Sequence, residues 1–229
     1  MEVRIVRITP DMVDAIASSY AITRGLSYTE FQEKYDTVEK KQKLITDCFE
    51  SGHLSGFEFA DIDFEILGCS RVFEVDKVRS RIASYEVEAG LFTDKRNFES
   101  VVPVGYDAET AEDRLNVIRQ WNEEDKAKGI DPRIRRYWTN QGLARRMRFK
   151  TNLRAFIETS WVRSCSCAQW EYREFMRQAE EKIYNIDPFI AGFINPKCVH
   201  LGYCNEKWNP CGRYPKKEDV LKAAGVIDA

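Results

Sequence analysis

The sequence has no apolar run that approaches the roughly 20 residues needed to cross a membrane. Its first ten residues, MEVRIVRITP, lack the long apolar core of a secretory signal. Both absences argue against a membrane-spanning or exported protein. We therefore expect a cytoplasmic protein that has no membrane partner.

A surplus of charge of either sign is also missing. Lysine and arginine number 35, aspartate and glutamate number 37, and the net charge is -2. Proteins that bind the phosphate backbone of nucleic acid normally have a basic surplus. We therefore expect no nucleic-acid partner, and any anion-binding site must come from a local cluster of basic residues.

Cysteine is too sparse for a disulfide scaffold, because an odd number of seven is scattered over 229 residues. Reduced thiols are expected. Cys198, His200, Cys204 and Cys211 are residue types that bind zinc. Their spacing is not the paired C-x-x-C form, so we assign no metal site.

The length and the 43% hydrophobic content allow one large core, and we predict a single domain over residues 1–229. Weak alternation over residues 2–8 predicts a strand, and the run FEFADIDFEIL predicts another. The apolar positions of that run change parity near Phe59 and Ala60, which predicts a bulge there.

Helical spacing of apolar residues predicts most of the remaining structure. One predicted helix starts at Val72, with Val75 and Val78 on the same side, and runs into RSRIASYEVEAGLF, which shows no period and predicts a loop. Prolines after Asp187 predict an irregular, cysteine-containing tail over about 188–229. The result is an α+β fold with a central antiparallel or mixed β-sheet packed with long helices. The other predicted helices begin near Asp11, span 29–49 and 107–129, and lie as one or two helices within 151–184.

Three polar constellations could bind a ligand. Arg79 and Arg81 precede Ser84 at a predicted helix end, and guanidinium groups can fork onto phosphate oxygens. A solvated arginine pair is the commoner explanation of that pattern. The basic stretch 133–154 suits an anionic ligand, or else it is a helix face paired with the acidic run 112–125. Polar residues after Arg163 indicate buried hydrogen bonds or a ligand.

These segments together resemble the flavin-dependent thymidylate synthases, whose signature is R-H-R-x-x-S-x-x-x-x-S-x-R. Arg79, Arg81 and Ser84 match that signature. The segment 52–58 resembles the family's GH-x-x-x-FEH, TNLR at 151–154 resembles its N-x-R, and 163–171 resembles its R-x-x-x-x-AQWE. The resemblance covers most of the chain in the right order.

The resemblance implies a flavoprotein methyltransferase of nucleotide biosynthesis that binds FAD and converts dUMP to dTMP. Methylenetetrahydrofolate would donate the carbon and NADPH would reduce the flavin. It also implies a homotetramer with sites between subunits, and it assigns no catalytic residue. The residues implied for the cofactor are His53, Ser55, Glu58, Arg79, Arg81, Asn152 and Arg154. Those implied for the pyrimidine nucleotide are Arg136, Arg163, Ser84, Ala89 and Gly90.

Three of the fixed residues of the family signature are replaced in this sequence. Ser80 replaces the histidine, Ala89 the second serine and Leu91 the last arginine. In the family these residues hold the nucleotide against the flavin. Three functions therefore stay open, namely methylation of dUMP, modification of another pyrimidine nucleotide such as UMP, and flavin or nucleotide binding without catalysis.

Overall fold

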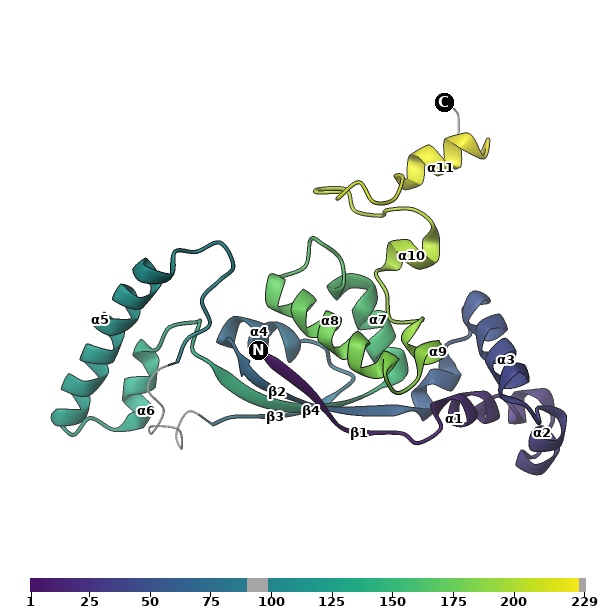
Figure 1. Cartoon of the computed structure of the whole chain (residues 1–229), viewed down its shortest axis with the longest axis horizontal. Helices are drawn as coiled ribbons and strands as arrows, with labels where there is room; N and C mark the ends of the chain where they lie inside the picture. The colour runs from purple at the N-terminus through teal and green to yellow at the C-terminus, as the bar shows by residue number, and fades with distance from the viewer. Residues whose placement is uncertain (90–98, 227–229) are drawn as a thin grey trace. The chain divides into compact units, whose positions relative to one another are not determined.

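The computed structural model describes residues 1–89 and 99–226 (Figure 1). They cluster into two compact units. Unit 1 comprises the described residues within Met1–Arg4 and Phe64–Phe149, and unit 2 those within Ile5–Asp63 and Lys150–Ala229. The expectation of one domain over the whole chain stays a prediction.

Among the described residues, the strands form a four-stranded antiparallel sheet in the order β1-β2-β4-β3. These strands are β1 (Glu2–Ile8), β2 (Asp61–Cys69), β3 (Ser84–Val87) and β4 (Arg145–Asn152). The apolar residues of β2 that share one parity, Ile62, Phe64 and Ile66, are fully buried, whereas Glu65 and Leu67 of the other parity are only partly covered. Together with the helices described below, the sheet confirms the predicted α+β fold.

Two strands escaped prediction. The basic stretch 133–154 is not one helix face, because its second half is β4, in which buried Met147 and Phe149 alternate with exposed Arg146 and Arg148. The long basic side chains conceal this period-two pattern in the sequence. The loop predicted within RSRIASYEVEAGLF contains β3, whose four residues are too few to show a period.

The bulge predicted near Phe59 and Ala60 is also wrong. Residues Ser55–Phe59 form a 3-10 helix, η2, which ends just before β2 begins at Asp61. The parity of the apolar residues therefore changes because the backbone changes from helix to strand. No extra residue within a strand is needed to explain it.

Unit 2 contains the helices α1 (Met12–Ser19), α3 (Val38–Glu50), α7 (Leu153–Arg163) and α8 (Trp170–Tyr184). Helix α1 packs against α3 and η2, and α7 packs against α8 (Figure 1). The Phe156 and Phe175 rings join α7 to α8, with centroids 6.2 Å apart in an edge-to-face contact. The prediction of one or two long helices within 151–184 is therefore confirmed, and there are two.

The single helix predicted over 29–49 is instead two, α2 (Tyr28–Lys34) and α3. Thr37 explains the break, because its hydroxyl accepts a hydrogen bond from the Lys40 amide and caps the start of α3. Three short helices lie in the tail that the sequence predicts to be irregular, and η1 (Ile22–Arg24) follows α1. The tail helices are α9 (Pro188–Ala191), α10 (Lys197–Leu201) and α11 (Lys217–Ala223).

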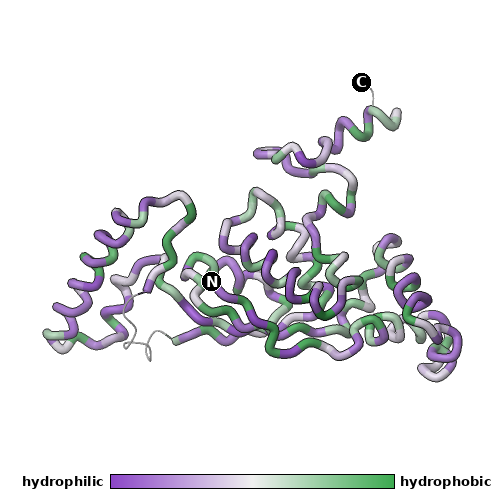
Figure 2. Tube along the Cα trace, in the orientation of Figure 1, coloured by the Kyte–Doolittle hydropathy of each residue, from purple (hydrophilic) through white to green (hydrophobic). Residues whose placement is uncertain are grey.

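Unit 1 contains α4 (Arg71–Lys77), α5 (Ala108–Ala127), α6 (Pro132–Arg135) and η3 (Arg136–Trp138). Helix α5 ends shortly before Gly129, as predicted, and Figure 2 shows it as mostly hydrophilic. Arg135 is buried and holds α6 against α5 by donating to the Asn122 side chain at 2.8 Å. None of the helices within 1–89 and 99–226 could span a membrane.

Helix α4 buries the opposite face from the one its valines suggest. Val72 and Val78 are exposed, whereas Phe73, Glu74 and Lys77 are buried. Charged side chains are almost never fully buried unless other groups compensate their charge. We therefore expect other groups in unit 1 to compensate the buried charges of Glu74 and Lys77. The sequence alone gives no sign of these groups.

Candidate functional site

In unit 2, the tyrosine Tyr20 holds the turn that carries the first predicted site residues. Its hydroxyl donates to the His53 carbonyl at 2.7 Å and accepts from the Gly56 amide at 3.1 Å. Burial raises the pKa of Tyr20, so the hydroxyl keeps its proton at neutral pH. The backbone from His53 to η2 is thereby fixed, while the side chains of His53 and Ser55 stay exposed.

An ion pair joins η2 to the start of α7. Arg154 Nη1 lies 2.7 Å from Glu58 Oε1, and Arg154 Nε lies 3.1 Å from Glu158 Oε1. The hydrogen bonds that Arg154 donates to Glu158 and then to Glu58 raise the pKa of Arg154. About 40% of the Arg154 side chain remains exposed, so its guanidinium is accessible to a polar ligand.

Asn152 caps α7 immediately before Arg154. Its side-chain oxygen accepts a hydrogen bond from the Ala155 amide at 2.9 Å, which satisfies one of the free amides at the helix start. The amide nitrogen of the same side chain can still donate to a ligand. The structure therefore places Asn152 and Arg154 at the end of α7 that packs against η2.

Arg163 lies at the other end of α7. Nine residues at roughly 1.5 Å each separate it from Arg154 by about 14 Å along the helix. Its guanidinium stacks over the Tyr172 ring, with 4.7 Å between the guanidinium carbon and the ring centroid. The structure therefore does not bring Arg163 to the Glu58 and Arg154 pair.

In unit 1, the predicted arginine pair lies in the turn between α4 and β3. Arg79 has a 71% exposed side chain, and its Nη1 lies 3.6 Å from Asp76 Oδ1. Arg81 and Ser84 are exposed as well. Ala89 is exposed beyond the end of β3, and the predicted residue Gly90 lies outside the described residues.

Sequence reasoning missed the two residues that brace this turn. The Tyr85 hydroxyl lies 2.6 Å from the Ser80 carbonyl and 2.9 Å from the Lys77 carbonyl. The Lys77 side chain is buried, with Nζ 3.9 Å from the Phe149 ring centroid. This cation–π contact replaces part of the hydration that the ammonium loses. Both contacts join segments that the sequence gives no reason to pair.

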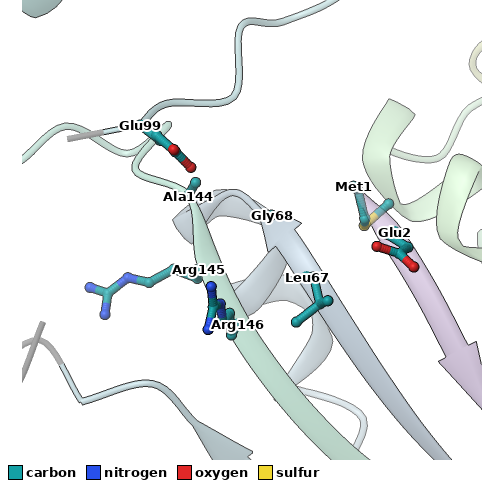
Figure 3. Close-up of a pocket in the computed structure, with 8 residues that line it drawn as sticks. All are labelled: Met1, Glu2, Leu67, Gly68, Glu99, Ala144, Arg145 and Arg146. Carbon is teal, nitrogen blue, oxygen red and sulfur yellow. The ribbon is translucent and has the colours of Figure 1, made fainter. Parts of the chain in front are cut away.

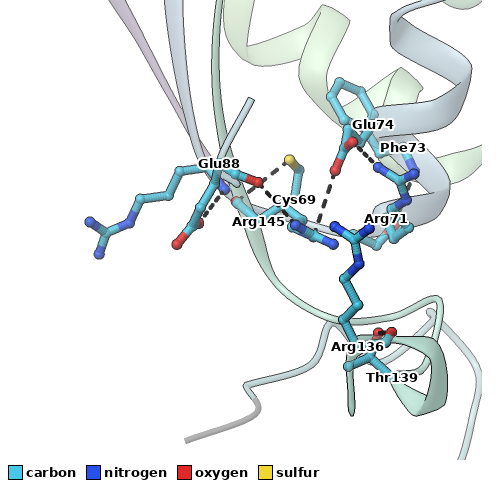
Figure 4. Close-up of polar contacts among 10 residues, drawn as sticks. Cys69, Arg71, Phe73, Glu74, Glu88, Arg136, Thr139 and Arg145 are labelled. Atoms are coloured by element: carbon cyan, nitrogen blue, oxygen red, sulfur yellow. Dashed lines mark hydrogen bonds and ion pairs between the residues drawn. The ribbon is translucent and has the colours of Figure 1, made fainter. Parts of the chain in front are cut away.

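A third group of residues surrounds the buried carboxylate of Glu74, which is 5% exposed (Figure 4). Arg71 donates to one carboxylate oxygen, and Arg145 Nε lies 3.7 Å from the other. Arg145 Nη1 also donates to the Glu88 carbonyl at 3.0 Å. In Figure 4 the exposed side chain of Arg136 points toward the same place. We call Arg71, Arg136 and Arg145 the arginine cluster.

Unit 1 also contains a hollow of about 510 Å³, whose lining residues are drawn in Figure 3. Of the arginine cluster only Arg145 lines it, and none of the residues predicted for the cofactor or the nucleotide that the structure describes does so. We therefore do not place the site there. Its lining residues are Met1, Glu2, Leu67, Gly68, Glu99, Ala144, Arg145 and Arg146.

The tail histidine that could have been a metal ligand is packed against aromatic rings in unit 2. His200 lies 5.2 Å from the Phe49 ring and 6.2 Å from the Trp161 ring, measured between centroids. Burial lowers the pKa of His200. Within the described ranges, no three potential ligands lie close enough to hold a metal ion.

Acid should destabilise the fold through His200. Because burial holds its folded pKa below the usual 6.5, the unfolded chain takes up the proton more readily. This contribution to stability is complete above pH 6.5 and is lost as the pH falls through the folded pKa. Urea unfolding from pH 8 to pH 5 should show a smaller acid loss for His200→Asn than for the unmodified protein. Equal losses would contradict this role.

A family model and individual related sequences both match this chain and agree on one family. The sequence model of the family described as "Thymidylate synthase complementing protein" matches residues 4–189. A flavin-dependent thymidylate synthase from Thermococcus onnurineus is 33% identical over 169 residues, which cover 68% of this chain and 69% of the relative. The one from Nitratidesulfovibrio vulgaris is 29% identical over 196 residues, covering 80% of each.

Solved structures support the same fold. Thymidylate synthase X from Helicobacter pylori, crystallised with FAD and dUMP, has a TM-score of 0.68 and 19% sequence identity. The similarity covers 83% of this chain and 99% of that one. The family match spans residues 4–189, and the relative from T. onnurineus supports it independently. The chain therefore belongs to the thymidylate synthase complementing protein family, that of the flavin-dependent thymidylate synthases.

Proposed function

We propose that this protein binds FAD and methylates C5 of a uracil nucleotide, with dUMP as the substrate. Methylenetetrahydrofolate would donate the carbon, and NADPH would be the reductant. The observation that carries the proposal is the family match over residues 4–189, which includes the segments 52–58, 79–84 and 151–171. A homotetramer, in which different subunits complete each site, is part of the proposal.

The residues present suit a dinucleotide cofactor. Arg79 and Arg81 are exposed on a braced turn, and their guanidinium groups can fork onto pyrophosphate oxygens. Asn152 offers a free amide donor, and the pair of Glu58 and Arg154 offers an acceptor beside a donor. We assign to FAD the set His53, Ser55, Glu58, Arg79, Arg81, Asn152 and Arg154.

Binding and orientation are the tasks of the protein in this chemistry. When bound, the flavin and the folate supply the hydride and the one-carbon unit. The chain's own groups would hold the nucleotide through Arg136 and Arg163, whose positive charges suit its phosphate or a polarised carbonyl. Ser84 would brace the loop beside β3, and Ala89 and Gly90 would lie along the nucleotide.

A second candidate is the same chemistry on another pyrimidine nucleotide, such as UMP. Ala89 has no hydroxyl and Leu91 has no charge, where the family signature has serine and arginine. A hydrogen bond to a charged group contributes about 1.5 to 3 kcal/mol. Losing such contacts alters which nucleotide binds best unless other residues supply them.

A turnover assay distinguishes these functions. FAD-loaded protein would be given methylenetetrahydrofolate and NADPH, with dUMP, UMP or dCMP offered separately, and the methylated product detected by mass. Product from dUMP supports the proposal. Product from another nucleotide alone supports the second candidate, and no product from any nucleotide would leave a flavin or nucleotide binder without catalysis.

The flavin assignment predicts that Arg79→Ala weakens FAD binding roughly 10-fold to 100-fold, because one charge-assisted hydrogen bond to phosphate is lost. Titration of apoprotein with FAD, followed by flavin fluorescence, measures the change. Arg177→Ala is the matched control, since Arg177 is also exposed and ion-paired, on α8. Equal FAD affinity of Arg79→Ala and the control would show that Arg79 does not bind the cofactor.

A further inference from the structure

The proposed function requires charged donors for the nucleotide phosphate, and the last arginine of the family signature is absent from this sequence. Leu91 stands where the family signature has its last arginine, and Ala89 where it has a serine. A nucleotide phosphate needs charged donors because each such hydrogen bond is strong and its loss is costly. Unit 1 contains a group of charged donors outside the signature, namely the arginine cluster around Glu74.

The arginine cluster has more positive charge than the carboxylates beside it. Arg71, Arg136 and Arg145 contribute three charges, and the buried Glu74 offsets one. The Glu88 carboxylate accepts from the Arg146 amide at 3.1 Å and offsets a second at most. Among the residues that the structure describes, the carboxylates in contact with the cluster therefore leave at least one positive charge over, which favours an anion at this place.

The position of Arg145 favours a ligand with several acceptors. Its side chain is 16% exposed, and its Nε lies 3.7 Å from Glu74 Oε2, too far for a hydrogen bond. Nε is buried and has no hydrogen-bond acceptor among the described residues. A buried charged donor without an acceptor is unfavourable, and a phosphate offers several oxygens to such groups.

Each arginine is presented by a different element. Arg71 begins α4 and is tied to Glu74 one turn later, yet 42% of its side chain stays exposed. Arg136 begins η3, and its carbonyl is held by the Thr139 hydroxyl at 2.9 Å. Arg145 begins β4 and is fixed by the Glu88 carbonyl. Because the three guanidinium groups come from three different elements, they can donate to an anion from different sides. Arginines on the face of a single exposed helix could not do so.

We propose that the arginine cluster binds the 5′-phosphate of the pyrimidine nucleotide, with Arg71 and Arg136 as the accessible donors and Arg145 as the fixed one. The inference rests on the proposed function and adds Arg71 and Arg145 to it, two residues outside the signature. It also explains how the loop can lose its arginine without loss of nucleotide binding.

The test compares a nucleotide with its nucleoside. FAD-loaded protein and its Arg71→Met variant would be titrated with dUMP and with deoxyuridine by calorimetry. The variant should bind dUMP roughly 10-fold to 100-fold more weakly, because a charge-assisted contact to phosphate is removed. Its affinity for deoxyuridine, which has no phosphate, should equal that of the unmodified protein.

Arg146→Met is the matched control. It removes the same charge from the next position of β4, where alternation directs the side chain to the opposite face of the strand. This control should bind dUMP like the unmodified protein. If Arg71→Met fails to fold by thermal melting, Arg71→Gln serves in its place, because glutamine removes the charge and keeps a donor for the Glu74 carboxylate.

The outcomes separate the inference from the proposed function. Equal dUMP affinity of Arg71→Met and the control overturns the inference while the proposed function stands. Loss of FAD from the variant, with dUMP affinity unchanged in refilled protein, would mean that the arginine cluster serves the cofactor phosphate and would also overturn it. Failure of the unmodified FAD-loaded protein to bind any uracil nucleotide would refute the proposed function itself.

Discussion

Gly56→Ala is expected to destabilise unit 2 and to empty the proposed flavin site. A Cβ on residue 56 would lie 2.4 Å from Tyr20 Cζ, a distance at which something must shift. Tyr20 is 4% exposed and has little room to move. Overpacking of this kind costs about 1 to 3 kcal/mol. Because η2 carries Ser55 and Glu58, its displacement should also reduce FAD retention, measured by absorbance at purification.

A double-mutant cycle with Tyr20→Ala isolates the cause. Gly56 does not have a positive φ, so alanine is compatible with its backbone, and the cost comes from the contact with Tyr20. In the Tyr20→Ala background the ring is gone, and Gly56→Ala should cost much less in urea unfolding. Additive free-energy changes would mean that the tyrosine is not the obstacle.

The sequence predicts those elements whose periodicity is undisturbed. The alternation of Ile62, Phe64 and Ile66 reveals β2, and the cap and glycine around α5 reveal that helix. Strand β4 stays hidden because basic side chains occupy its exposed positions, 146, 148 and 150, so the stretch looks like a charged surface segment. Helix α4 is predicted in extent, but its valines suggest the wrong buried face.

The residues of the candidate site can be predicted only where they belong to a short sequence motif. Arg79, Arg81 and Asn152 are found from short spacings that resemble a family signature. The residues that hold them in place are not, because their contacts join distant parts of the chain. Tyr20 meets His53 across 33 positions, and Arg145 meets the Glu88 carbonyl across 57. Such pairs depend on tertiary packing, which no local pattern encodes.

Glu74→Ala should destabilise unit 1 by about 3 to 5 kcal/mol, because it leaves Arg145 partly buried without its counter-charge. Urea unfolding measures the loss, and Glu74→Gln should lose less since it keeps the shape and an acceptor for Arg71.

This prediction assumes that the charges of Glu74 and Arg145 compensate each other. Removing both, in Glu74→Met with Arg145→Met, should therefore recover much of the stability. A double variant as unstable as the sum of its single changes would show that Glu74 acts through packing, and the arginine cluster would then need no carboxylate to hold it together.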